Sequence, residues 1–164
     1  MKKYLILLFI ITGIAAPLFC QMNAEKIFER DWDGKIIDFK KVYRNKGITE
    51  KEIETPGITD GKLFTFDDIL EHIKIKVAYT FSKRVLVSKI IEADTKDEKE
   101  LKRLSDLLRK MAVRKLGKPI RDVIAGSSKT TAWRAVKEIS AILKLTDKTA
   151  VLQVTYNSRI KNTK

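Results

Sequence analysis

The sequence predicts an α+β fold, in which an antiparallel or mixed sheet of about five strands carries two amphipathic helices packed on one face. Two segments lead to this prediction. From Ile73 to Phe81, apolar side chains alternate with lysines and small residues, which is typical of a half-buried strand. From Thr95 to Gly117, a capping motif, an apolar stripe and a terminating glycine indicate an amphipathic helix. The 164 residues suit a single α+β domain, which we place at residues 25–157.

The first 20 residues have the pattern of a secretory signal peptide. Lys2 and Lys3 precede an uncharged, mostly apolar run that ends at Cys20. We expect cleavage between residues 20 and 24. Two alternatives are lipidation at Cys20, as the first residue of a lipoprotein, and an uncleaved membrane anchor. All three predict an exported protein that is periplasmic or attached to the cell envelope.

The first part of the domain is expected to begin with a β-hairpin at residues 26–43. Asp33 and Gly34 provide the positive φ angles that a two-residue hairpin turn needs. Residues 44–62 are polar and rich in glycine, which favours a loop. Residues 66–71 follow a threonine and contain two early aspartates, so they predict one or two turns of helix.

The strand at residues 73–81 is expected to pair with a second β-branched run at residues 84–91. A helix over residues 66–81 is the competing interpretation, because some apolar residues there also recur at helical spacing. The density of β-branched residues favours the strand.

Two helices and a strand are expected in the second part of the domain. The first helix follows Thr95 and ends at Gly117, and the second spans residues 128–145. Residues 149–156 predict a closing strand, and residues 158–164 a polar basic tail. The apolar stripe of the first helix comprises Leu101, Leu104, Leu108 and Met111.

The charge is distributed unevenly along the chain. The protein has 34 basic and 21 acidic residues, with a net charge of +13. Residues 21–78 hold 11 basic and 12 acidic residues, whereas residues 79–164 hold 21 basic and 9 acidic residues. The second half therefore predicts attraction to polyanions. The alternative is a solvated basic surface that only keeps the protein soluble.

The segment from Ala125 to Thr131 carries a weak candidate for anion binding. If the predicted second helix begins here, backbone N–H groups at its start could hold an anion beside Ser127, Ser128 and Lys129. The alternative is that these serines only cap the helix. The segment lacks the glycines of a phosphate-binding P-loop.

The stretch from Ala125 to Val136 also resembles the helix-turn-helix of lactose-repressor-type DNA-binding proteins. It has the turn glycine, a polar start and an arginine in the expected place at position 134. The resemblance covers 12 residues and fails at Arg121, Asp122 and Ser127, where that family has small or apolar residues. It implies an alternative function, a membrane-anchored DNA-binding protein with a helix-turn-helix near residues 120–136.

The sequence offers no catalytic set with a recognisable motif. His72 is the single histidine, and neither a Gly-x-Ser-x-Gly motif nor a metal-ligand spacing is present. A pair of carboxylates for glycoside hydrolysis has no sequence signature, so that class stays open. We expect a non-enzymatic envelope protein without cofactor or metal. The expected partners are an anionic membrane surface, a wall polymer or an acidic envelope protein, and the main alternative partner is nucleic acid.

Overall fold

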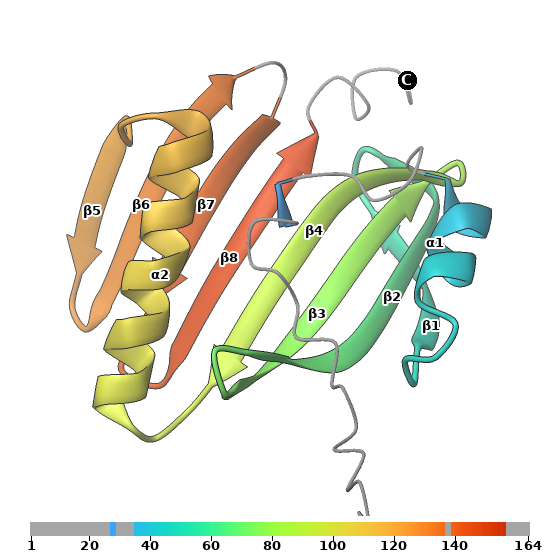
Figure 1. Ribbon diagram of the computed structural model, residues 1–164. Coiled ribbons are helices and arrows are strands. Elements are labelled where there is room, and N and C mark those ends of the chain that lie inside the picture. Colours follow the sequence, from blue (N-terminus) through green and yellow to red (C-terminus); the bar gives the residue numbers. More distant parts are fainter. Residues whose placement is uncertain (1–26, 29–34, 137–138, 157–164) are drawn as a thin grey trace, which may run out of the picture.

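In the computed structural model, residues 27–28, 35–136 and 139–156 are described, and they form one eight-stranded antiparallel sheet with two helices (Figure 1). The signal segment with Cys20 and the tail at residues 158–164 lie outside the described residues. The helices are α1 (Ile36–Val42) and α2 (Glu98–Leu116). The strands are β1 (Thr49–Thr55), β2 (Ile58–Leu70), β3 (Ile73–Ser82), β4 (Val85–Asp94), β5 (Arg121–Ala125), β6 (Ser128–Val136), β7 (Ile139–Leu145) and β8 (Thr149–Tyr156).

The sheet is built from two similar halves. Each half is a helix followed by four strands that pair with their neighbours in sequence, and the order across the sheet is β1-β2-β3-β4-β8-β7-β6-β5. The two halves join where β4 pairs with β8, from Ser88 opposite Thr155 to Asp94 opposite Thr149. This pairing brings the last strand of the chain into the middle of the sheet.

The predicted fold of about five strands is wrong, because four predicted segments form different elements. Residues 128–145 are not a helix but contribute β6 and β7. Their apolar residues fit the helical period of 3.6 residues as well as the strand period of two. In the structure Leu143 is 3% exposed and Ile142 is 48% exposed, as expected for opposite faces of a strand. Residues 66–71 are not a helix but belong to the long β2 and its turn.

The N-terminal predictions also need correction. The expected loop at residues 44–62 contains β1 and the start of β2. Strand β1 lies at the edge of the sheet and exposes every residue except the half-buried Ile53, so its polar sequence is typical of a loop. The expected hairpin at residues 26–43 contains α1, where Asp38 in the first turn and Lys40 in the last favour a helix. Most of that hairpin's first strand lies outside the described residues.

Four predicted elements are confirmed. The alternating run at residues 73–81 is β3, and its predicted partner at 84–91 is β4. The predicted closing strand is β8, whose alternate residues from Ala150 to Tyr156 are buried. The first predicted helix is α2, although its N-cap is Asp97 rather than Thr95. The Asp97 carboxylate accepts hydrogen bonds from the amides of Lys99 and Glu100.

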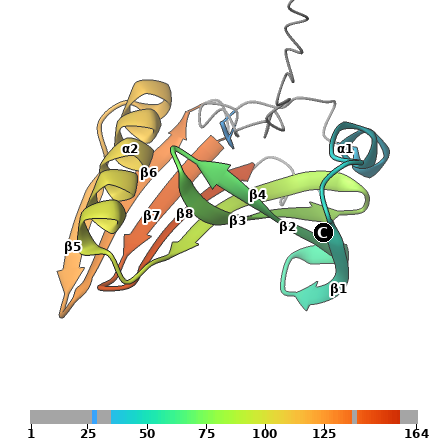
Figure 2. The same ribbon diagram turned by 60° about the horizontal axis from the view of Figure 1, so that its bottom comes forward.

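Both helices cover the same face of the sheet, and no helix of the described residues lies on the opposite face (Figure 2). The strand register places Phe64, Tyr79, Val154 and Trp133 on the covered face. Helix α2 lies over β6, β7 and β8, with its predicted apolar stripe buried against them. Neither this helix nor any other in the described part of the chain is long and apolar enough to cross a membrane.

Helix α1 is held on the sheet by an aromatic cluster. Phe39 is fully buried, and the centroid of its ring lies 4.9 Å from that of Tyr79, 5.1 Å from that of Phe64 and 5.5 Å from that of Phe81. The hydroxyl oxygens of Tyr43 and Tyr79 are 3.0 Å apart. Large rings therefore provide most of the contact between this short helix and the sheet.

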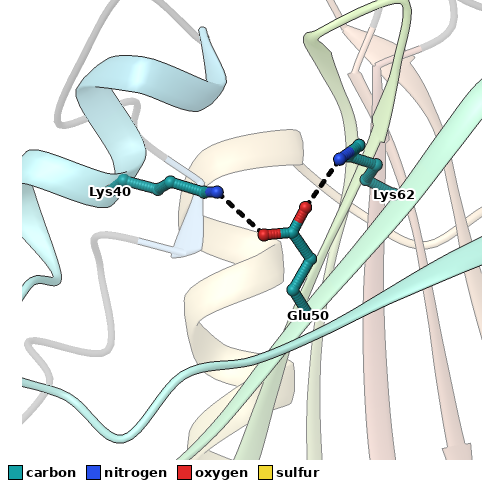
Figure 3. Close-up of polar contacts among 3 residues, drawn as sticks. All are labelled: Lys40, Glu50 and Lys62. Carbon is teal, nitrogen blue, oxygen red and sulfur yellow. Dashed lines mark hydrogen bonds and ion pairs between the residues drawn. The ribbon is translucent and has the colours of Figure 1, made fainter.

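A carboxylate between two lysines adds a polar link beside that cluster (Figure 3). Glu50 of β1 accepts hydrogen bonds from Lys40 of α1 at 2.8 Å and from Lys62 of β2 at 2.7 Å. The two bonds lower the pKa of the Glu50 carboxyl, and the bond to Glu50 raises the pKa of the Lys62 ammonium group. The charges of the first half are thus partly neutralised within the fold.

Candidate functional site

An open cleft of about 560 Å³ lies between helix α2 and strands β6 and β7. Its apolar floor consists of Leu101 from α2 together with Leu143 and Leu145 from β7. Leu101 and Leu143 are only 4% and 3% exposed, so the surrounding core fixes their positions. The volume falls within the usual range of small-molecule sites, about 300 to 1,000 Å³.

Charged side chains line the edges of this cleft. The basic residues are Lys99, Lys102, Arg109 and Lys129, and the acidic residues are Glu98, Asp106 and Asp147. Lys102 comes from α2 and Lys129 from β6, so the two ammonium groups come from opposite walls. No ion pair within the described residues involves either of them.

An ion pair ties one wall of the cleft to the edge strand β5. Arg109 of α2 donates to the carboxylate of Asp122 at 3.0 Å, and the hydroxyl of Thr131 donates to the other oxygen of the same carboxylate. The Thr131 hydrogen bond, followed by that of Arg109, lowers the pKa of Asp122. Arg109 is therefore already engaged, whereas Lys102 and Lys129 line the cleft without an ion pair among the described residues.

The solvent side of α2 is a second basic feature, which we call the cationic face. The helix contains seven basic and three acidic residues, and its apolar stripe holds it rigidly against the sheet. Arg103 of this face lies 3.1 Å from the carboxylate of Glu71 in an exposed ion pair. The exposed cations of this face are Lys99, Lys102, Arg103, Lys110, Arg114 and Lys115.

The three residues predicted to bind an anion lie in a hairpin. Gly126 and Ser127 form the turn between β5 and β6, and Ser128 is the first residue of β6. No helix begins there, so the amide groups invoked for that prediction have no structural basis. Only Lys129 of the three lines the cleft.

The predicted helix-turn-helix is wrong for the same reason. Residues 121–136 form β5, a tight turn and β6, and Gly126 has φ +57° in that turn. The structure therefore offers no recognition helix near residues 120–136. His72 also lies in a hairpin turn, between β2 and β3, and no cluster of three metal-ligating residues occurs among the described residues.

A larger hollow of about 870 Å³ lies against the β1–β2 hairpin at the sheet edge. Its lining isoleucines, at positions 36, 53 and 58, are only half-buried, and its acidic and basic residues are equal in number. It lacks the fixed apolar floor of the α2 cleft, so we regard the α2 cleft as the better candidate.

The sequence interpretation missed most of the cleft. Leu143 and Leu145 share one face of β7 by simple alternation, but this pattern was assigned to a helix. The contribution of Lys102 and Leu101 depends on which strands α2 covers, and the crossing from β4 to β5 determines this. Comparison with protein families, curated proteins and solved structures finds none that matches this chain.

Proposed function

We propose that this protein is exported to the cell envelope and acts there, without catalysis, by binding an anionic surface through the cationic face of α2. The observation that carries this proposal is the concentration of exposed cations on one rigid helix. The N-terminal pattern of Lys2, Lys3 and the following apolar run supports export.

The geometry suits contact with a membrane or a polymer of negative charge. A helix of 19 residues is about 28 Å long, so its cations form an extended ridge rather than a point site. Each Lys or Arg near an anionic bilayer contributes roughly 1 kcal/mol at physiological salt. Several such contacts together give useful affinity without a deep pocket.

The mode of binding follows from the composition of the cationic face. Val113 is the one large apolar residue with notable exposure on α2, at 38%. The helix therefore lies on a surface by charge rather than by inserting apolar side chains. Such binding weakens as salt is added, because ions screen exposed charges beyond about 10 Å at 0.1 M.

Cosedimentation of the full chain with vesicles tests the binding. We expect stronger binding to vesicles with an anionic lipid than to neutral vesicles, and loss of the difference at high salt. The double change Lys110→Glu and Arg114→Glu should reduce binding to anionic vesicles about tenfold or more. The matched control, Lys41→Glu with Lys74→Glu, changes the charge equally but away from α2.

Two results would overturn the binding proposal. One is equal loss with the control pair, because the effect would then follow net charge alone. The other is binding that does not distinguish neutral from anionic vesicles. Near-ultraviolet circular dichroism of each variant verifies that the fold is retained.

Intact mass of the protein from fractions of its native host tests export separately. We expect an envelope protein that begins after one of residues 20 to 24, or one that begins at a lipidated Cys20. A cytosolic chain that starts at Met1 would contradict this part of the proposal.

A further inference from the structure

The cleft between α2 and the sheet has properties that the cationic face lacks. A buried leucine floor lies beneath the edges, and two unpaired lysines come from opposite walls. A smooth polyanion such as a wall polymer has no apolar part to cover the floor. The combination instead matches a molecule that has an apolar chain and a small acidic head group.

We propose that this cleft binds a single-chain anionic amphiphile. The chain lies on Leu101, Leu143 and Leu145, and the head group lies between Lys102 and Lys129. Leu101 and Leu143 are already buried, so the apolar surface that the chain removes from water is mainly that of the half-buried Leu145, at about 25 cal/mol per Å². The positive charges of the two lysines favour a ligand whose head group is negatively charged. Lys102 belongs to both the cleft and the cationic face, so Lys129 of β6 is the residue that distinguishes this inference from binding by the cationic face.

The acidic residues of the cleft do not reverse this sign preference. Glu98 lies in the first turn of α2, where the helix dipole stabilises a negative charge. Asp106 is exposed on α2, where water and salt screen its charge. Asp147 is exposed in the turn between β7 and β8, beside the exposed Lys148. Lys129, in contrast, is half-buried in the wall of the cleft.

The far end of the cleft is closed by groups that are already satisfied. Arg109 and Thr131 both bond to Asp122, so this end offers no free cation to an incoming acid. The chain therefore runs along the leucines, and the head group stays at the edge where Lys102 and Lys129 meet solvent. This placement makes Lys129 the residue most sensitive to head-group charge.

Isothermal titration of the full chain with laurate below its micelle concentration tests the proposal. Dodecyltrimethylammonium and dodecyl maltoside, with the same chain and a cationic or neutral head, are the matched probes. We expect laurate to bind most tightly. Backbone amide shifts in the NMR spectrum should concentrate at Lys129, Leu143 and Leu145.

Variants at the edge of the cleft separate charge from packing. Lys129→Glu should weaken laurate binding about fivefold to tenfold and Lys129→Gln about twofold to threefold, with neutral-probe binding unchanged. Lys110→Glu, on the outer side of α2, should leave laurate binding unchanged. Equal affinity for the three probes, amide shifts confined to other regions, or unchanged laurate binding by Lys129→Glu would overturn the proposal.

Discussion

The two halves of the sheet share a topology but are stabilised differently. The first half holds its short helix with aromatic rings, and the second holds a helix of 19 residues with an aliphatic stripe. In the first half, the Phe39 ring contacts four other aromatic rings. In the second half, Leu101, Leu104 and Leu108 bury one face of α2. One arrangement of strands therefore tolerates two quite different helix–sheet interfaces.

The halves also differ in how many of their charged residues form ion pairs with neighbouring elements. In the first half, Glu50 lies between two lysines and Lys46 forms an ion pair with Asp68 at 3.0 Å. In the second half, basic residues outnumber acidic ones and most of those on α2 are exposed. The comparison teaches that ion pairs in the first half link neighbouring elements of the fold, whereas α2 in the second half presents a surplus of cations to solvent.

The largest expected effect comes from removing the ring that anchors α1. Phe39→Ala should lower the free energy of unfolding by about 3 to 5 kcal/mol, because it empties the centre of the aromatic cluster. Leu108→Ala, its counterpart under α2, should cost about 2 to 5 kcal/mol. Urea unfolding followed by circular dichroism measures both. A cost below 1 kcal/mol for Phe39→Ala would show that α1 contributes little to the fold.

A smaller effect is expected from crowding the edge of the first half. A Cβ atom at Gly61 would overlap the carbonyl oxygen of Ile53 on β1, so Gly61→Ala should cost about 1 to 3 kcal/mol. Gly47→Ala is the control, since no atom lies within 4 Å of the Cβ position there. Thermal unfolding of the two variants compares them directly. Equal midpoints would contradict the close approach of β1 and β2.

The smallest effect is on acid stability, and each half provides one carboxylate. Glu50 and Asp122 both have a pKa below the ordinary value in the folded protein, because partners bond to their charged forms. The stability that each provides is present above its unfolded pKa and lost as pH falls through its folded pKa. Glu50→Gln and Asp122→Asn should each flatten the fall in melting temperature between about pH 5 and pH 3.

The two carboxylate variants also refine the comparison of the halves. Both groups are near the surface, so each change should be small and should shrink in high salt. An unchanged acid profile in both variants would show that the acid sensitivity of the fold arises elsewhere. A larger change at Asp122 would indicate that the link between α2 and β5 contributes more to the acid sensitivity of the fold than the Glu50 ion pairs do.

Elements with one strong periodicity could be predicted from the sequence. Strand β3 alternates cleanly, and α2 combines a cap, a stripe and Gly117. Strand β1 could not be predicted, because an exposed edge strand needs no apolar face. The residues of β6 and β7 were predicted to be a helix because their apolar side chains fit both the helical period of 3.6 residues and the strand period of two. The pairing of β7 with β8 is the long-range interaction that favours the strand.

The candidate cleft shows the same limit more strongly. Lys129 was singled out from sequence, but for a helix start that does not exist. Its actual neighbours in the cleft, such as Lys102 and Leu143, are distant in sequence and meet only through the order of the strands. Local patterns indicate the faces of elements, whereas a cleft between elements depends on long-range pairing.

The central position of β8 has a consequence for the order in which the protein can fold. Residues 149–156 are the last strand to leave the ribosome, yet they alone join β4 to β7. Until they are made, the chain consists of two separate meanders with unpaired inner strands. Completion of the sheet must therefore wait until residues 149–156 have been synthesised, so the inner edges of both meanders stay unpaired until then.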